Sequence, residues 1–124
     1  MAGKLHFFRE ALSRFEEALN IEPNNPLAVD GAIQRFEFTF ELAWKAIQEK
    51  LYLSEGIEIK SPRQALMQAY VLGWILDERL WLDILDDRNH TSHTYDQRLA
   101  SVIYSHFPIY VEAFLALCHK LETS

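Results

Sequence analysis

Apolar residues recur at steps of three and four near the N-terminus, and this spacing predicts an amphipathic helix over about residues 5–19. The apolar stripe consists of Leu5, Phe8, Leu12, Phe15 and Leu19. Charged side chains occupy the opposite face, as a solvated helix surface requires. We expect this helix to end before residues 23–26, where two prolines flank two asparagines.

A longer apolar pattern predicts a second helix over about residues 27–53. Its main stripe is formed by Ile33, Phe36, Phe40, Ala43, Ile47 and Leu51. Other apolar residues fall partly off that stripe, namely Phe38, Leu42, Ala46 and Leu53. A helix that is apolar around so much of its circumference is buried on more than one side. We therefore expect it to lie at the centre of a bundle or to form part of a subunit interface.

The start of a third helix is signalled strongly after a connecting loop at Gly56. Ser61 is the expected N-cap, and Pro62 occupies the first helical position. Gln64 completes the pattern of a capping box. The helix is predicted to stop at Gly73.

Two further helices are predicted in the rest of the chain. Asp77 is the expected cap of the fourth, and the last is expected to span about residues 96–121 with a kink at Pro108. No stretch of period two is long enough to require a strand. The pattern as a whole predicts an all-α, antiparallel up-and-down bundle of about five helices.

The composition is that of a globular protein, because 49% of the 124 residues are hydrophobic and 24% are charged. This length favours one domain over residues 1–124. The formal net charge of −6 argues against a surface that captures nucleic acid broadly, although it leaves room for a small basic site.

The single cysteine and the hydropathy of the chain indicate the cellular compartment of the protein. Cys118 lies in an apolar run and is expected to be buried and reduced. The N-terminus meets Arg9 and Glu10 too early for a signal peptide, and no apolar run approaches the roughly 18 residues of a membrane-spanning helix. We therefore expect a cytoplasmic protein without a membrane partner.

Residues 86–98 form a polar segment in which Tyr95 is the only large apolar side chain. Between Arg88 and Arg98 this segment carries two histidines, an asparagine and several hydroxyl groups, without Gly or Pro. A solvated connection between helices is one interpretation. Clusters of these side chains also bind phosphates or carry out acid–base chemistry, which makes the segment a candidate site.

The spacing of Arg88 and His93 restricts how they can share a site. On a continuous α-helix, side chains five positions apart point about 140° away from each other. They converge only if the helix breaks between them, or if each faces the symmetry mate of the other. A site that needs both residues therefore predicts a helix break, a dimer, or both.

Asp86, His90 and His93 have spacings that could suit a transition metal. Because no H-E-x-x-H pattern or cysteine pair accompanies them, we expect no metal, and we predict no cofactor. A glycine-rich phosphate loop and a G-x-S-x-G elbow are also missing from the sequence, which argues against P-loop enzymes and ordinary serine hydrolases. The other histidines are expected to be structural or solvated: His6, His106 and His119.

Residues 88–95 have the arrangement R-x4-H-x-Y, which resembles the motif of the HEPN superfamily in its HepT-like branch. This branch is also called the nucleotidyltransferase substrate-binding protein family. Residues 34–45 look like the second-helix signature of the family. Residues 61–63, 73–75 and Trp81 follow in the expected order, so the resemblance covers nearly the whole chain.

The resemblance implies a homodimer or a higher oligomer with the R-x4-H motifs at a composite cleft. Similar proteins are metal-independent endoribonucleases that act on RNA as toxins. A partner minimal nucleotidyltransferase is the antitoxin, and it transfers AMP to the motif tyrosine. Carried over, Arg88 and His93 are the catalytic pair, Asn89 is a supporting polar residue and Tyr95 is the AMP acceptor.

The charged residues of the second helix are interpreted as a solvated face, because Glu37, Glu41 and Lys45 follow one another at single-turn spacing. Glu41 could also serve the site, but we do not count it among the catalytic residues. Trp44 is expected in the core. His90 is a candidate assistant that the motif does not require.

Two other functions fit the same residues. A non-catalytic subunit could present substrate or nucleotide to a separate nucleotidyltransferase, and the polar segment would then bind phosphate without cutting RNA. A purely structural helical dimer would fit a disordered polar segment and a Tyr95 that is never modified.

Overall fold

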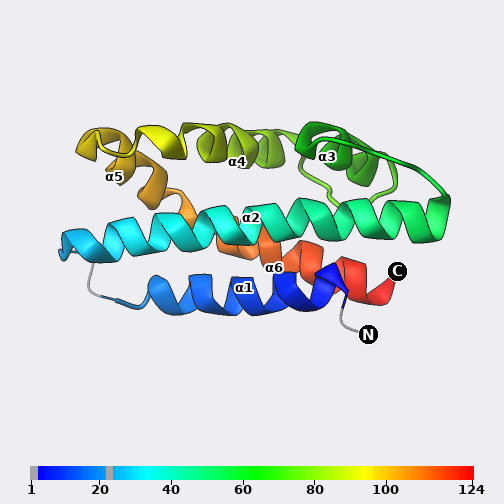
Figure 1. Cartoon of the computed structure of the whole chain (residues 1–124), viewed down its shortest axis with the longest axis horizontal. Coiled ribbons are helices and arrows are strands. Elements are labelled where there is room, and N and C mark those ends of the chain that lie inside the picture. Colours follow the sequence, from blue (N-terminus) through cyan, green and yellow to red (C-terminus); the bar gives the residue numbers. More distant parts are fainter. Residues whose placement is uncertain (1–2, 22–23) are drawn as a thin grey trace.

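The computed structural model describes residues 3–21 and 24–124, and every regular element in these ranges is a helix. Figure 1 shows the chain running back and forth along the long axis of the molecule. The six α-helices and one 3₁₀ turn of the described ranges are α1 Lys4–Ala18, α2 Pro26–Glu55, α3 Pro62–Val71, α4 Glu78–His90, η1 Thr91–His93, α5 Gln97–Ser105 and α6 Phe107–Thr123. The predicted all-α up-and-down bundle is confirmed. Pro23, expected in the turn after the first helix, lies outside the described residues.

The longest helix, α2, is the centre of the bundle. It packs against α1 and α6 on one side and against α3, α4 and α5 on the other (Figure 1). Of the residues off its main stripe, Ala46 is buried and Leu42 is half-buried, whereas Phe38 and Leu53 are exposed. The first interpretation of this helix, a central position in a bundle, is therefore confirmed.

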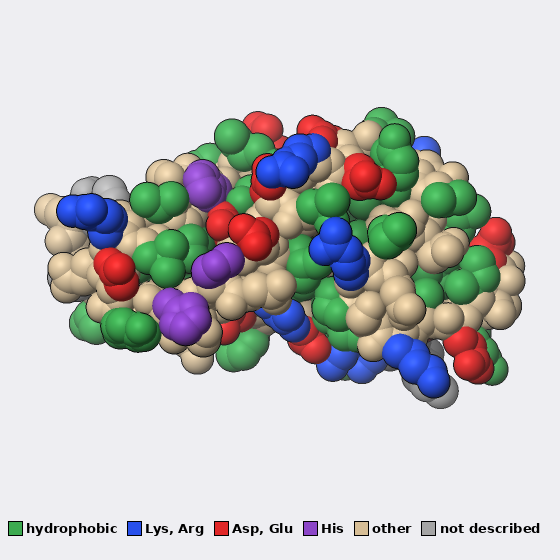
Figure 2. Space-filling view, turned by 90° about the horizontal axis from the view of Figure 1, so that it is seen from above, with side chains coloured by type: hydrophobic (Ala, Val, Ile, Leu, Met, Phe, Trp, Pro, Cys, Tyr) green, Lys and Arg blue, Asp and Glu red, His purple; other side chains and the backbone are tan. Residues whose placement is uncertain are grey.

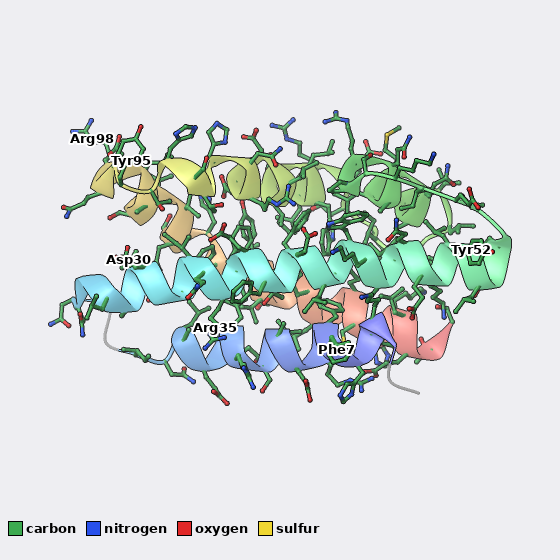
Figure 3. All side chains as sticks on the ribbon, viewed as in Figure 1. Phe7, Asp30, Arg35, Tyr52, Tyr95 and Arg98 are labelled. Carbon is green, nitrogen blue, oxygen red and sulfur yellow. The ribbon has the colours of Figure 1, made fainter. Side chains whose placement is uncertain are left out.

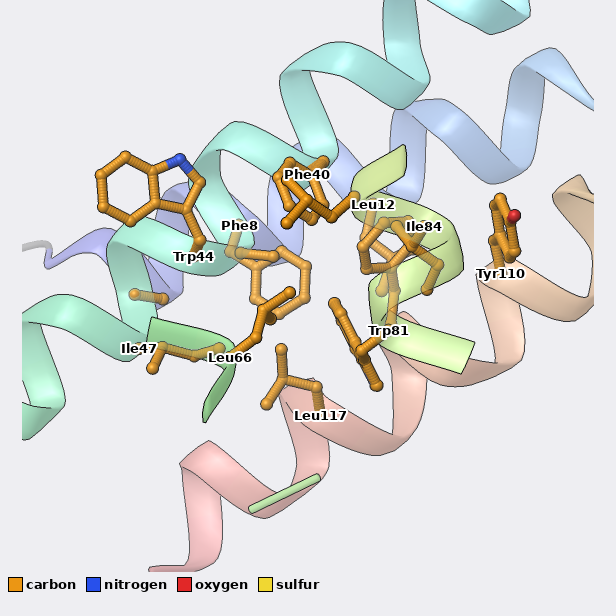
Figure 4. Close-up of a cluster of buried hydrophobic side chains, with 14 of the residues drawn as sticks. Phe8, Leu12, Phe40, Trp44, Ile47, Leu66, Trp81, Ile84, Tyr110 and Leu117 are labelled. Atoms are coloured by element: carbon orange, nitrogen blue, oxygen red, sulfur yellow. The ribbon is translucent and has the colours of Figure 1, made fainter. Parts of the chain in front are cut away.

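The helices share one hydrophobic core with an aromatic centre, and Figure 4 shows side chains from several helices converging there. The ring of Phe36 on α2 lies 4.9 Å from Phe107 and 5.8 Å from Tyr110 between centroids. Phe15 and Phe114 belong to the same cluster, 6.0 and 6.4 Å from Phe36. Burying one such ring stabilises the fold by about 1.5–3 kcal/mol. This cluster therefore fixes α1 and α6 against α2.

Cys118 is buried at the edge of this core, as expected. Its Sγ lies 3.6 Å from Oε1 of Glu122. Burial, followed by the nearby carboxylate, raises the pKa of the thiol. The side chain is consequently a protonated thiol and a weak nucleophile.

The predicted helix caps are present. Ser61 Oγ accepts a hydrogen bond of 3.2 Å from the amide of Gln64, and Asp77 Oδ1 accepts one of 3.0 Å from the amide of Leu80. The second half of the capping box differs from the expected form, because Gln64 Oε1 accepts from the amide of Lys60 at 2.9 Å. Either way the side chain of Gln64 satisfies a backbone donor before the helix.

The expected single helix over residues 96–121 is instead two helices, α5 and α6, with His106 between them. The missing N–H of Pro108 and the clash of its ring with the carbonyl of Tyr104 disfavour one continuous helix. The two helices are bent by 47° at this break. Among the described residues no single helix is long and apolar enough to cross a membrane, although α5 and α6 together meet that test of length and composition.

Candidate functional site

The chain has a helix break between Arg88 and His93, which is one of the two arrangements that their spacing predicted for a shared site. Helix α4 ends at His90, and η1 continues the chain as a 3₁₀ turn. The buried hydroxyl of Thr91 lies 2.8 Å from the carbonyl oxygen of Arg88 and 3.1 Å from Glu37 Oε2, and both are acceptors for its proton. Thr94 Oγ1 donates to the carbonyl of Thr91 at 2.9 Å. These contacts hold the turn against α2.

Arg88 points inward from the last turn of α4 toward α2. Its Nη2 donates to Glu41 Oε2 at 2.9 Å, and its guanidinium carbon lies 5.5 Å from the centre of the Phe40 ring. Its Nη1 donates to Asn89 Oδ1 at 3.1 Å. The side chain is 30% exposed. Because a guanidinium has five N–H donors, others remain for a ligand.

Glu41 is the residue that holds Arg88, and it also accepts from Trp44 Nε1 at 3.1 Å and from Lys45 Nζ at 3.2 Å. Burial by itself raises the pKa of this carboxyl, but the three hydrogen bonds outweigh burial and lower it. Trp44 is buried, as expected.

Glu37 is exposed, as a solvated face predicts, whereas Glu41 is half-buried, and both carboxylates also contact the residues around the helix break. Their spacing of four residues correctly placed both carboxylates on one side of the helix. This spacing could not reveal which residues the two carboxylates contact, because Arg88 is 47 positions from Glu41 and Thr91 is 54 positions from Glu37.

His93 and Tyr95 lie beyond the break and are exposed. Their rings meet edge to face, with centroids 6.1 Å apart and an interplanar angle of 78°. Tyr95 is 84% exposed, and Figure 3 shows it beside Arg98 at one end of the molecule. In the described part of the chain no hydrogen bond joins Arg88 to His93. Within one chain, Arg88 is therefore held against α2, whereas His93 lies on the exposed turn after the break.

His90 lies between these groups, with Nδ1 2.7 Å from the carbonyl oxygen of Asp86 and 3.9 Å from the carboxylate of Asp86. Figure 2 shows histidine side chains among acidic ones on the face that α4 and the following turn form. Within residues 3–21 and 24–124, no three His, Cys, Asp or Glu side chains are arranged to hold a metal ion.

A family model described as "Nucleotidyltransferase substrate binding protein like" matches residues 3–123. The chain belongs to this family. The resemblance inferred from residues 88–95 and 34–45 is thereby confirmed.

Individual relatives agree with the family. The chain is 37% identical over 81 residues to a Haemophilus influenzae protein described as "Probable ribonuclease HepT". That match covers 62% of this chain and spans 56% of the length of the relative.

Two solved structures of family-like fold align over nearly the whole chain. One is a crystal structure of a protein from Thermus thermophilus, with 38% identity, a TM-score of 0.87 and coverage of 92% of this chain and 98% of that one. The other, from Haemophilus influenzae, has 27% identity, a TM-score of 0.81 and coverage of 96% and 99%. Its structure is described as revealing the fold of a substrate binding domain of a nucleotidyltransferase.

A second polar cluster lies next to the motif residues, around Asp87. Asp87 Oδ2 accepts from the hydroxyl of Tyr110 at 2.6 Å and lies 2.7 Å from Nδ1 of His106. Burial, followed by the hydrogen bond to Asp87, raises the pKa of the Tyr110 phenol. The cluster ties the end of α4 to the α5–α6 junction, so His106 has the structural role expected of it. The sequence pattern gave no sign of Asp87, which lies within the polar segment.

Proposed function

We propose that this chain is a metal-independent endoribonuclease of the HEPN type, a toxin that a partner minimal nucleotidyltransferase neutralises by transferring AMP to Tyr95. One observation carries the proposal: Glu41 holds Arg88 just before a helix break, and His93 and Tyr95 lie exposed just after it. A fixed cation, an accessible imidazole and an accessible phenol are the groups that this chemistry needs. The named relative described as a ribonuclease supports the same activity.

RNA cleavage without metal uses the neighbouring 2′-hydroxyl as the nucleophile. The 2′-oxygen forms a bond to phosphorus while the bond from phosphorus to the 5′-oxygen breaks, which leaves a 2′,3′-cyclic phosphate and a 5′-hydroxyl. His93 accepts the 2′-hydroxyl proton or supplies a proton to the leaving oxygen. Arg88 binds the phosphate and offsets the charge that develops in the transition state, with Asn89 as its polar neighbour.

A homodimer would complete the machinery. Each chain offers one His93, and the reaction uses a base and an acid. Two chains that meet at the motif supply both imidazoles and two Arg88 side chains. Because these cationic and imidazole groups gather at one place while each chain carries a net charge of −6, we expect RNA contact to be confined to this cleft.

Transfer of AMP to Tyr95 would silence this site. The phenolic oxygen forms a bond to the α-phosphorus of ATP, pyrophosphate leaves, and the phenolic proton is lost to solvent. The product places a negatively charged phosphodiester near His93, whose ring centroid is 6.1 Å from that of Tyr95. The added charge and bulk repel the RNA phosphate and block access.

The central test is RNA cleavage by the purified, unmodified protein in EDTA. We expect wild type to cut, and Arg88→Ala and His93→Ala to lose cleavage. The matched control is Arg79→Ala, because Arg79 pairs with Asp83 in an exposed contact at the start of α4. Cleavage that survives in both motif variants contradicts the assignment of these residues.

AMP transfer is tested by intact-mass measurement after incubation with ATP and the partner nucleotidyltransferase. We expect mass increments equal to AMP on wild type and none on Tyr95→Phe. Increments that persist on Tyr95→Phe place the acceptor elsewhere.

The second candidate is a non-catalytic subunit that presents substrate to the nucleotidyltransferase. The ion pair of Arg88 with Glu41 favours it, because that carboxylate already offsets the arginine charge within one chain. Co-purification with the nucleotidyltransferase, together with no RNA cleavage under any condition, would select this function.

A further inference from the structure

An open cavity of about 220 Å³ lies beside the turn that carries the AMP acceptor. It is lined from the start of α2 by Asp30 and Val29, and from the other side by Thr94 and Gln97. Thr94 directly precedes Tyr95 in the chain. Figure 3 shows Asp30 on the side of α2 that faces the segment bearing Tyr95. The backbone that carries Tyr95 is therefore next to this cavity.

The lining has the chemistry of a site for a neutral ring rather than for a phosphate. None of the described residues around the cavity is Lys, Arg or His, and Asp30 brings a negative charge. Val29 and Ala100 provide apolar contact, and Gln97 provides an amide. Cavities for drug-sized ligands begin at about 300 Å³. This smaller one suits a single base whose ribose and phosphate stay outside.

The polar groups also select among bases. An amide such as that of Gln97 pairs with the N6 amino group and N7 of adenine, and a carboxylate such as that of Asp30 accepts from an exocyclic amino group. Guanine presents the acceptors O6 and N7 on that edge, which call for Arg or Lys rather than for Gln97. Its N1–H and 2-amino donors lie on another edge and can pair with Asp30, so the discrimination between the two purines comes from Gln97. Uracil presents O4, also an acceptor.

We propose that this cavity binds the adenine base through Asp30 and Gln97. The inference rests on the proposed function, which brings nucleotides to Tyr95 and His93. The adenine has two sources there: the AMP attached to Tyr95, or a nucleotide of the RNA that flanks the scissile phosphate. The base contacts would be the same in both cases.

The first experiment measures binding on the unmodified full chain. Adenosine 5′-monophosphate is titrated in while the backbone amide signals of Thr94 and Gln97 are followed by NMR, with guanosine 5′-monophosphate as the control ligand. We expect the adenine nucleotide alone to shift these signals, and Asp30→Ala and Gln97→Ala each to weaken binding about tenfold. Glu58→Ala, at an exposed acid beyond the far end of α2, is the matched control and leaves binding unchanged. Equal responses to the two nucleotides, or shifts elsewhere only, overturn the proposal.

The second experiment separates the two sources. If RNA supplies the base, cut sites mapped by sequencing show a preference for adenine that Asp30→Ala abolishes and Glu58→Ala retains. If the attached nucleotide supplies it, Asp30→Ala instead speeds the removal of AMP from modified protein by an added phosphodiesterase.

These outcomes keep the two proposals distinct. Cleavage and modification at wild-type levels, with neither cut-site preference nor AMP removal altered in Asp30→Ala and Gln97→Ala, overturn the base site and leave the proposed function standing. Selective binding of the adenine nucleotide without any RNA cleavage supports the base site and contradicts the proposed ribonuclease.

Discussion

The guanidinium of Arg88, at the end of α4, lies 2.9 Å from the carboxylate of Glu41, in the middle of α2. Glu41 is itself fixed by Trp44 and Lys45 on the same helix. The direction of the Arg88 side chain is thus set by the longest helix of the bundle rather than by the polar segment to which it belongs. Glu41 is accordingly a positioning residue for the proposed reaction.

Glu41→Gln is expected to slow RNA cleavage about tenfold, because a charge-assisted hydrogen bond to Arg88 becomes a neutral one. Both side chains are partly exposed, so the free energy of unfolding should change by less than about 1 kcal/mol. Initial cleavage rates and urea denaturation measure the two effects, with Glu58→Gln as the control. An unchanged rate would show that Arg88 needs no such support.

The same carboxylate predicts a pH dependence. The pKa of Glu41 is lowered in the folded protein from an ordinary value of 4.5, so its contribution to stability is fully present above that value and is lost as the pH falls through the lowered pKa. The difference in unfolding free energy between wild type and Glu41→Gln should therefore shrink below pH 4.5. Denaturation curves at pH 7 and in acid test this, and a constant difference contradicts it.

Thr91→Val is expected to loosen the helix break. The substitution removes the hydroxyl that donates to the Arg88 carbonyl or to Glu37, at a cost of about 1 kcal/mol in the free energy of unfolding. Hydrogen exchange should become faster at the amides of η1, and cleavage should fall. Thr91→Ser keeps the hydroxyl and is the matched control. Unchanged exchange in Thr91→Val would mean that the backbone alone maintains the turn.

Local signals explain how much of this fold could be predicted from sequence. Ser61 and Asp77 cap their helices because a side-chain oxygen beside the first turn meets unpaired amides, and this needs only a few neighbouring residues. Pro108 predicted an interruption of the last helix for a reason that is also local, because proline lacks the N–H and clashes with the preceding turn. Whether that interruption is a kink or a complete break depends on what the flanking helices pack against, and a single sequence does not contain that information.

The candidate site shows the same division. Arg88, His93 and Tyr95 are candidates from their spacing and from the family resemblance. Helix geometry predicted a helix break between Arg88 and His93, a dimer, or both, and the structure shows the break. Glu41 lies far from them in sequence, so only the packing of α2 against α4 reveals its contact. Asp87 was missed for the same reason, because both of its partners lie later in the chain, at or beyond the α5–α6 junction.

Asp87→Ala should destabilise the fold by about 1–3 kcal/mol, because it removes the acceptor for a largely buried phenol. The side chain of Asp87 is only 17% exposed, and its carboxylate contacts both His106 Nδ1 and the hydroxyl of Tyr110. Asp83→Ala is the matched control, since that aspartate forms an exposed pair and should cost about 0–1 kcal/mol. Equal losses in urea denaturation would argue that the cluster adds nothing to stability.

The buried phenol of Tyr110 predicts how the stability of the fold changes at alkaline pH. Burial and Asp87 raise the pKa of its phenol above the ordinary value of 10.0, so the contribution of the neutral phenol is fully present below that pH and is lost as the pH rises. Wild type should consequently lose its stability advantage over Tyr110→Phe above about pH 10. Thermal unfolding across that range measures the effect, and parallel curves for the two proteins contradict it.

Asp30, Glu37 and Glu41 stand at intervals of seven and four residues along α2, which places them within about 20° of one line on the helix surface. The spacing of these carboxylates fixes how far apart their contacts lie along α2. Asp30, at the proposed base cavity, is about 10 Å along the helix axis from Glu37, at the helix break, and Glu37 is about 6 Å from Glu41, which holds Arg88. Inserting one residue between Asp30 and Glu37 would rotate Asp30 by about 100° relative to Glu37 and Glu41, so both parts of the site could stay folded while losing their alignment with each other.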